Sequence, residues 1–102
     1  MEKEEGFEAR ETKAIDIPVC ELNARFHADV IHCGEKEWFA IVQIPFYYFD
    51  DDEQTDPREI HIVGGGESPK SAMDLCKARL DETLRRGELR MKEVGFYLFL
   101  RR

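Results

Sequence analysis

The sequence predicts an α+β domain in which a mostly antiparallel sheet is backed by one long helix. Three observations predict it: several short segments alternate apolar and polar residues, one later segment has a helical repeat, and 102 residues suffice for a single hydrophobic core. The expected order of elements is strand, strand, strand, helix, strand, with room for an extra strand at the N-terminal end. We expect no second domain.

The helix is expected at about residues 69–86, where both of its ends are marked. Ser68 can accept a hydrogen bond from a first-turn amide, Pro69 suits the first helical position, and Gly87 can adopt the left-handed conformation that ends a helix. Between these ends, apolar side chains recur at spacings of three and four and form a stripe: Ala72, Leu75, Cys76, Leu80 and Leu84. This stripe should lie across the sheet.

The N-terminal residues 1–13 are mostly charged and contain a single aromatic residue, Phe7. We expect a flexible acidic tail over 1–13 and a single domain over 14–102. Alternation over residues 15–19 predicts a short strand, which Pro18 would end or place at a sheet edge. Whether residues 14–25 are strand or helix stays open: the segment 18–25 fits either a helical turn that begins at Pro18 or a turn around Asn23 that joins two strands.

Four further segments have the alternation or apolar content of strands. They are 26–33, 38–49, 58–63 and 94–100. The run 38–49 is the most apolar in the chain, and we expect Pro45 to mark a bulge or the end of regular pairing. Residues 50–57 have the composition of a loop.

The overall charge limits the class of partner. The formal net charge is −7 and the isoelectric point is near 5.0, which argues against a general nucleic-acid binder, because such affinity comes from cationic contacts with phosphate. Residues 50–59 alone carry about −5, so a basic partner is natural. Three cysteines cannot form a paired disulfide framework, and no apolar run is long enough to cross a bilayer. We therefore expect a cytoplasmic protein that has no membrane segment.

The residues that enter the helix carry a family resemblance. They follow the G-x-G-x-S-K-K-x-A-K pattern through which the last strand of a double-stranded-RNA-binding domain enters its final helix; the matching residues are Gly64, Gly66, Ser68, Lys70 and Ala72. Pro69 and Met73 stand where that family has two phosphate-binding lysines. With the closing strand at 94–100, the order of elements is similar to the HicB-type antitoxin fold, a partial version of that domain. The HicB-like resemblance implies a small antitoxin or inhibitor that neutralises a partner protein. The alternative is an RNA-binding module that uses Lys70 and Lys77.

No group of residues has the spacing of a catalytic, cofactor or metal site. The glycines at 64–66 lack the spacing of a phosphate-binding loop, and the acidic run at 50–56 lacks the alternating oxygens of a calcium loop. The histidines and cysteines show no paired metal-ligand spacing; they are His27, His32, His61, Cys20, Cys33 and Cys76. We expect a non-enzymatic protein without a cofactor. A small enzyme with a site near Ser68 and His61 is a weaker alternative.

The apolar strand at 38–49 points instead to a protein interface. Alternate residues of a strand face opposite sides of the sheet, and both sets are largely apolar here, whereas one helix can cover only one side. The uncovered set should meet another protein, and a homodimer is the simplest such arrangement. Alternatively, residues 15–19 fold over that face and hide it. The predicted contact residues are Trp38, Phe39, Ile41, Tyr47, Asp50, Asp51 and Asp52.

Overall fold

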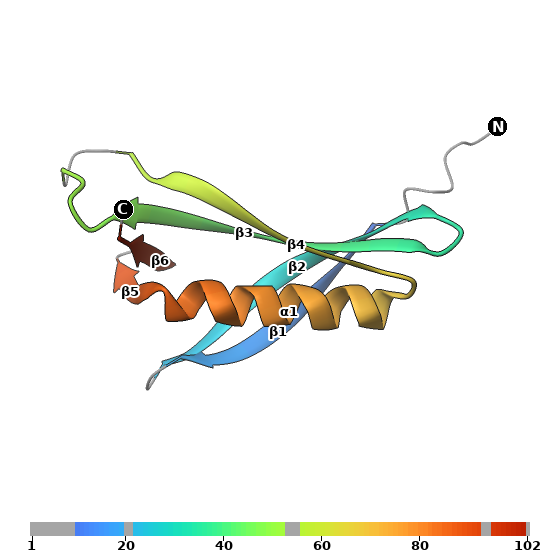
Figure 1. Ribbon diagram of the computed structural model, residues 1–102. Coiled ribbons are helices and arrows are strands. Elements are labelled where there is room, and N and C mark those ends of the chain that lie inside the picture. The colour runs from blue at the N-terminus through green and yellow to red at the C-terminus, as the bar shows by residue number, and fades with distance from the viewer. Residues whose placement is uncertain (1–9, 20–21, 53–55, 93–94, 102) are drawn as a thin grey trace.

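The computed structural model describes residues 10–19, 22–52, 56–92 and 95–101, and it confirms the α+β class. The described residues form one six-stranded sheet and one helix, which runs along the sheet (Figure 1). The elements, in chain order, are β1 (Arg10–Val19), β2 (Leu22–Gly34), β3 (Glu37–Tyr48), β4 (Arg58–Gly66), α1 (Pro69–Arg85), β5 (Gly87–Lys92) and β6 (Gly95–Leu100).

Strand β3 is the centre of the sheet, because three strands pair with it. It is antiparallel to β4 from Trp38 to Phe46 and antiparallel to β2 near its start. Strand β6 pairs with its end, from Phe46 to Tyr48, and this pairing is parallel. Since β4 occupies one edge of β3 as far as Phe46, β6 must take the edge that β2 leaves after Ile41. The sheet is thus mostly antiparallel with one parallel exception.

Strand β5 is absent from the order of elements that the sequence predicted. It follows α1 directly and pairs antiparallel with β6, with the buried Leu89 opposite Leu98. The charged Glu88 and Arg90 alternate with Leu89, which is the period of a strand. The prediction was wrong here because residues 88–93, between the expected helix and the expected last strand, were assigned to no element.

At the other end of the chain, residues 14–19 and 22–25 are strand and not a helical turn. The expected turn around Asn23 is wrong, because Asn23 lies within β2 and pairs with Pro18. Strands β1 and β2 form a hairpin whose register runs from Arg10 opposite Ile31 to Val19 opposite Leu22. The connecting residues 20–21 lie outside the described residues. Because β1 begins at Arg10, residues 10–13 belong to the sheet and not to the expected tail; residues 1–9, with Phe7, also lie outside the described residues.

Pro45 does not mark a bulge, contrary to expectation. The register between β3 and β4 passes through Pro45 without a shift, whereas the irregularity in the sheet lies between His32 and Gly34 of β2. Along the other edge of β3, the pairing with β2 ends at Ile41 and the pairing with β6 begins at Phe46. Pro45 lies between these two pairings. Proline suits this stretch because it has no N–H to donate to a neighbouring strand.

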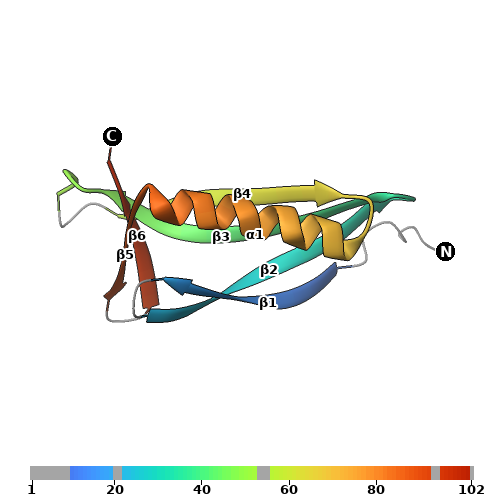
Figure 2. The ribbon, with the colours of Figure 1, turned by 60° about the horizontal axis from the view of Figure 1, so that its bottom comes forward.

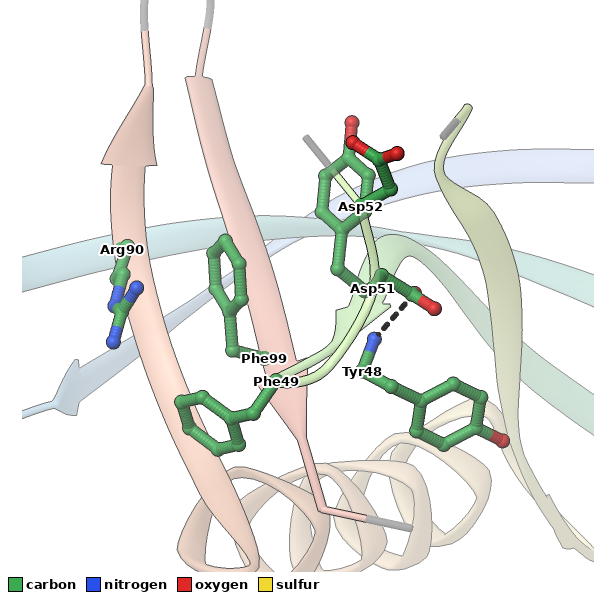
Figure 3. A pocket seen from close by; sticks show the side chains of 7 residues that line it. Tyr48, Phe49, Asp51, Asp52, Arg90 and Phe99 are labelled. Atoms are coloured by element: carbon green, nitrogen blue, oxygen red, sulfur yellow. Dashed lines mark hydrogen bonds between the residues drawn. The ribbon is translucent and has the colours of Figure 1, made fainter. Parts of the chain in front are cut away.

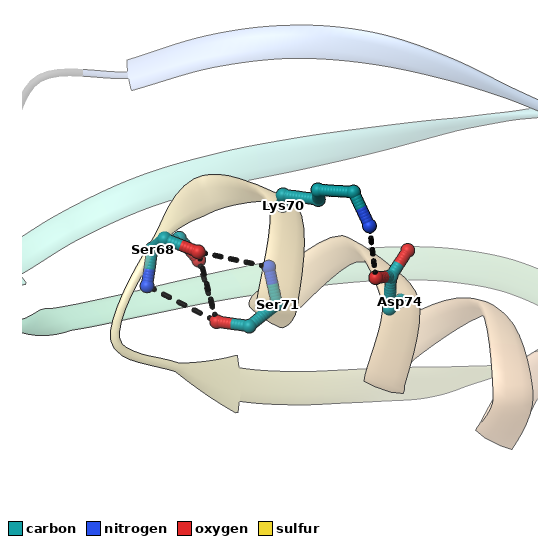
Figure 4. Close-up of polar contacts among 4 residues, drawn as sticks. All are labelled: Ser68, Lys70, Ser71 and Asp74. Atoms are coloured by element: carbon teal, nitrogen blue, oxygen red, sulfur yellow. Dashed lines mark hydrogen bonds and ion pairs between the residues drawn. The ribbon is translucent and has the colours of Figure 1, made fainter.

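The beginning of α1 is held by the cap that the sequence predicted. The Ser71 amide donates to the Ser68 hydroxyl at 3.1 Å, and the Ser68 amide donates to the Ser71 hydroxyl at 3.1 Å (Figure 4). At the other end, Arg86 caps the helix in a right-handed conformation, and its amide donates to the Thr83 carbonyl. Gly87 therefore does not end the helix in a left-handed conformation; it is the first residue of β5.

The core lies between α1 and one face of the sheet, which we call the inner face. The buried helix residues are spaced four apart: Ala72, Cys76, Leu80 and Leu84. They meet β3 and β4, where Ala40, Val42, Ile44 and Ile62 are buried. Leu75 was expected on this stripe, but it is 37% exposed. Successive helix residues are rotated by about 100°, so Leu75 points well away from the direction of the buried Cys76.

Candidate protein interface

The face of the sheet opposite α1, which we call the outer face, is the candidate functional surface. On β3 it carries the odd-numbered residues Phe39, Ile41, Gln43, Pro45 and Tyr47, because successive strand residues point to opposite sides. The described residues contain one sheet and one helix, and the helix lies on the inner side (Figure 2). No element of the described part of the chain therefore forms a layer over the outer face.

One part of this face is an apolar row, which we define as Ile31, Phe39, Ile41 and Val63. Phe39 pairs with Ile31 of β2, and Ile41 pairs with Val63 of β4, so the row crosses three strands. All four side chains are half-buried. The Phe39 ring lies across Gly65, where an added Cβ would come within 3.1 Å of a ring carbon. The Phe39 ring thus covers the backbone of Gly65.

Polar pairs border the apolar row. The Thr12 hydroxyl donates to Asp29 at 3.2 Å, and His61 lies 3.0 Å from Glu59. Further along the β1–β2 hairpin, Arg25 donates to Asp16 at 2.6 Å. Exposed pairs of this kind contribute little to stability, but they give the row the polar rim that is typical of protein interfaces.

Another part of the outer face is an aromatic cluster, which we define as Tyr47, Phe49, Tyr97 and Phe99. Tyr47 and Phe99 are stacked, with their centroids 5.5 Å apart. Tyr97 and Phe49 flank this pair at 5.7 Å from Tyr47 and 5.9 Å from Phe99 respectively. Phe49 is the more exposed of the two large apolar residues that are exposed in the described chain, at 40%.

Arg90 of β5 lies over this cluster. Its guanidinium is 4.5 Å from the centroid of Phe99 and 5.5 Å from that of Phe49, which is the geometry of a cation–π contact (Figure 3). Its Nε donates to the Glu88 carboxylate at 2.7 Å, and this hydrogen bond lowers the pKa of Glu88. Sequence reasoning missed Arg90 because it missed β5.

The acidic turn after β3 is only partly available for contact. Asp51 was predicted as a contact residue, but its side chain is 7% exposed and holds the turn: Oδ2 accepts from the Tyr48 amide at 2.8 Å and from Arg58 at 2.9 Å. Asp50 and Asp52 are exposed. Asp51 therefore has a structural role in this turn.

Of the other predicted contact residues, Phe39, Ile41 and Tyr47 do share the outer face, whereas Trp38 does not. Trp38 lies on the inner side, where it packs against the core and stacks on His32, with ring centroids 4.0 Å apart. The correction follows from the alternation, since Trp38 has the same parity as Ala40. Sequence reasoning missed Ile31 and Val63 of the apolar row. Their place on the outer face can be assigned only when it is known that Ile31 pairs with Phe39 and Val63 with Ile41.

Lys70 and Lys77, the predicted nucleic-acid contacts, are exposed on α1 and away from the outer face. The ammonium of Lys70 donates to Asp74 at 2.9 Å, and this hydrogen bond raises the pKa of Lys70 (Figure 4). The lysine that the RNA-binding resemblance depends on most is thus paired with a carboxylate of its own helix.

The described cysteines and histidines form no cluster that could hold a metal ion. Cys76 is buried under α1, where desolvation raises the pKa of its thiol, and Cys33 is exposed. Cys20 lies outside the described residues. Over residues 10–19, 22–52, 56–92 and 95–101, no three His, Cys, Asp or Glu side chains are grouped as metal ligands would be. Nor is any helix of that part of the chain long and apolar enough to span a membrane.

Comparisons of the chain with protein-family models, with curated proteins and with solved structures found no match. The resemblance to HicB-type antitoxins and to RNA-binding domains therefore stays a prediction from the residues that enter α1.

Proposed function

We propose that the protein is a non-enzymatic protein-binding module that contacts its partner through the outer face. One observation carries the proposal: the inner face is covered by α1, whereas the outer face bears the apolar row and the aromatic cluster with no layer of described residues above them. Contiguous apolar surface on a soluble chain is typical of a contact site, particularly with aromatic residues and arginine present.

The HicB-like resemblance suggests what such binding would do. A small protein that covers another protein's surface can neutralise it without catalysis, as an antitoxin or inhibitor does. A second copy of the chain is the simplest additional occupant, because a two-fold axis through the outer face would bring two apolar rows together. We therefore propose a homodimer in the absence of the partner.

RNA binding is the weaker proposal. It would depend on Lys70 and Lys77, and Lys70 is already paired with Asp74. The net charge of −7 opposes the approach of a polyanion, and Pro69 and Met73 replace two of the expected lysines. No contact among the described residues favours it over the protein interface.

Sedimentation velocity on the purified chain at tens of micromolar, with capture from a lysate of the source cells, tests the proposal. The variant Ile41→Ser should lose self-association and partner capture, because it places a hydroxyl in the middle of the apolar row. Leu75→Ser is the matched control, since Leu75 is an exposed aliphatic residue on α1. Circular dichroism confirms that both variants are folded.

Two results would contradict the proposal. One is a wild-type chain that is strictly monomeric and retains no partner. The other is a loss of association in Leu75→Ser with none in Ile41→Ser, which would move the contact to the helix.

A further inference from the structure

Strand β3 lacks a neighbour along part of one edge. Its pairing with β2 ends at Ile41 and its pairing with β6 begins at Phe46, so no described strand pairs with this edge in between. Before Asp29, β2 runs away from β3 and, among the described strands, pairs only with β1 (Figure 2). A cavity of about 240 Å³ lies where β2, β3 and β6 separate, and we call it the strand cleft.

Backbone groups of β3 point into the strand cleft. The Phe49 amide donates to the Leu100 carbonyl of β6, so Phe49 directs its backbone toward this edge. Successive residues of a strand direct their N–H and C=O groups to opposite edges, so Pro45 and Gln43 face this edge as well. Gln43 therefore offers the cleft an N–H and a C=O, whereas Pro45 offers only a C=O.

Strand β2 contributes to the cleft in the same way. Ile41, which faces this edge by the same alternation, pairs with Asp29, so the backbone of Asp29 faces β3. Two and four residues before Asp29, His27 and Arg25 face the same direction. There, however, β3 is no longer paired with β2.

Strand β6 contributes Phe96. The Leu100 carbonyl faces β3, and alternation places the backbone of Phe96 on the same edge, before the pairing with β3 begins at Leu98. The residues that alternation assigns to the cleft all line it: Arg25, His27, Gln43, Pro45 and Phe96. No described strand pairs with them on this edge, and backbone groups of this kind bind water or an added strand.

The side chains around the strand cleft differ between the two faces of the sheet. Three apolar side chains lie on its inner side: Phe26, Ile44 and Phe96. Three exposed polar side chains lie on its outer side: Arg25, His27 and Gln43. The charge of Arg25 is balanced by Asp16 at 2.6 Å. An occupant would thus meet apolar groups on one side and uncharged or paired polar groups on the other, as a half-buried strand does.

We propose that the strand cleft binds an extended, uncharged segment of the partner protein, which adds to the sheet as a short strand. The inference rests on the proposed function, because it states how a partner of the adjoining outer face is held. The backbone of the segment would bond to Gln43 and His27, and its alternate side chains would contact Ile44 on the inner side. In strand addition of this kind, backbone hydrogen bonds supply affinity and alternate side chains supply specificity.

Hydrogen exchange of the backbone amides, measured by NMR on the full chain, tests the inference. Without ligand, the Gln43 amide should exchange much faster than those of Val42 and Ile44, which face β4. The probe is a capped heptapeptide of alternating valine and threonine with a lysine at each end. It should slow exchange at Gln43 and His27. The same heptapeptide with N-methylated valines is the control, because it lacks the donors of one edge.

A substitution at Gln43 separates backbone from side chain. Gln43→Pro removes the N–H that faces the cleft and no bond to β4, and Pro45 already occupies the equivalent position two residues later. It should weaken binding of the probe by about threefold to tenfold, as expected for one hydrogen bond. Gln43→Thr is the matched control, since it keeps the N–H and changes only the side chain. Heteronuclear NMR spectra establish that both variants are folded, and the exchange measurements on the wild type need neither of them.

Three outcomes would overturn the inference: a Gln43 amide that is already protected without ligand, protection by the probe along β1 or β5 and not at Gln43, or equal binding of the N-methylated control. Ile41→Ser distinguishes these failures from failure of the proposed function. If the probe does not protect Gln43 while Ile41→Ser still loses its partner, only the strand cleft is refuted. If Ile41→Ser keeps its partner while the probe protects Gln43, the strand cleft stands and the apolar row is not the interface.

Discussion

Gly64 of β4 lies directly against the backbone of Cys76 in α1. A Cβ built on Gly64 would overlap the Cys76 amide nitrogen and lie 2.6 Å from the Ala72 carbonyl oxygen. These neighbours are helix backbone, which cannot rotate away as a side chain can. Glycine at this position therefore sets how closely α1 approaches the sheet.

Gly64→Ala should consequently lower the free energy of unfolding by about 3 kcal/mol or more, because the helix must move away from the sheet to admit the methyl group. Gly65→Ala is the control on the adjacent residue. Its Cβ would meet the edge of the Phe39 ring at 3.1 Å, and a ring can shift. Urea denaturation measures both variants, and an equal loss in the two would mean that backbone contact with α1 is not the cause.

Leu80→Ala and Leu84→Ala should each destabilise the chain by about 2–4 kcal/mol, since both side chains are buried beneath α1. Leu75→Ala should lower the free energy of unfolding much less, because it is the same substitution at an exposed position. The same denaturation measurement applies. A loss below about 0.5 kcal/mol at Leu80 would show that the stripe faces solvent.

The two described cysteines should differ in reactivity. Cys33 is exposed and should react with iodoacetamide in the native protein, whereas Cys76 should be alkylated only on unfolding. Peptide mapping by mass spectrometry locates the label and separates both from Cys20. Comparable native alkylation at Cys33 and Cys76 would contradict the buried position of Cys76.

Stability should also depend on pH through Cys76. Burial raises the pKa of its thiol in the folded chain, so the folded state holds this proton more tightly than the unfolded state. The stabilisation is complete below the unfolded pKa of about 8.5 and is lost as the pH rises through the folded pKa. Cys76→Ala should reduce the loss of stability at alkaline pH, which a series of urea denaturations at increasing pH measures. If the variant loses stability with pH as the wild type does, other groups cause that loss.

Duplex RNA should bind only weakly at physiological salt, because the chain is acidic and Lys70 is paired with Asp74. A gel-shift titration with a duplex of about 20 base pairs checks this; such a duplex exceeds the roughly 16 base pairs that RNA-binding domains of this kind span. Submicromolar binding that Lys70→Ala abolishes, and that salt weakens steeply, would promote the RNA-binding alternative.

The local features of this chain were determined by its sequence. The cap formed by Ser68 and Ser71, the first helical residue Pro69 and the inward face of β3 all depend on residues within a few positions of one another. Capping and strand alternation are short-range effects, so they act on the chain before it folds. The choice of α+β class follows from them.

The tertiary structure alone decided which strands share each edge of β3. Strand β6 takes the edge that β2 leaves, and this pairing places Phe99 beside Tyr47. The pairing of β5 with β6 then brings Arg90 over Phe99 and Phe49. The tertiary structure also assigned Asp51 to holding a turn with Arg58. The contact between Tyr47 and Phe99 joins residues far apart in sequence, so its loop-closure entropy is offset only when the whole sheet forms, and no local pattern predicts it.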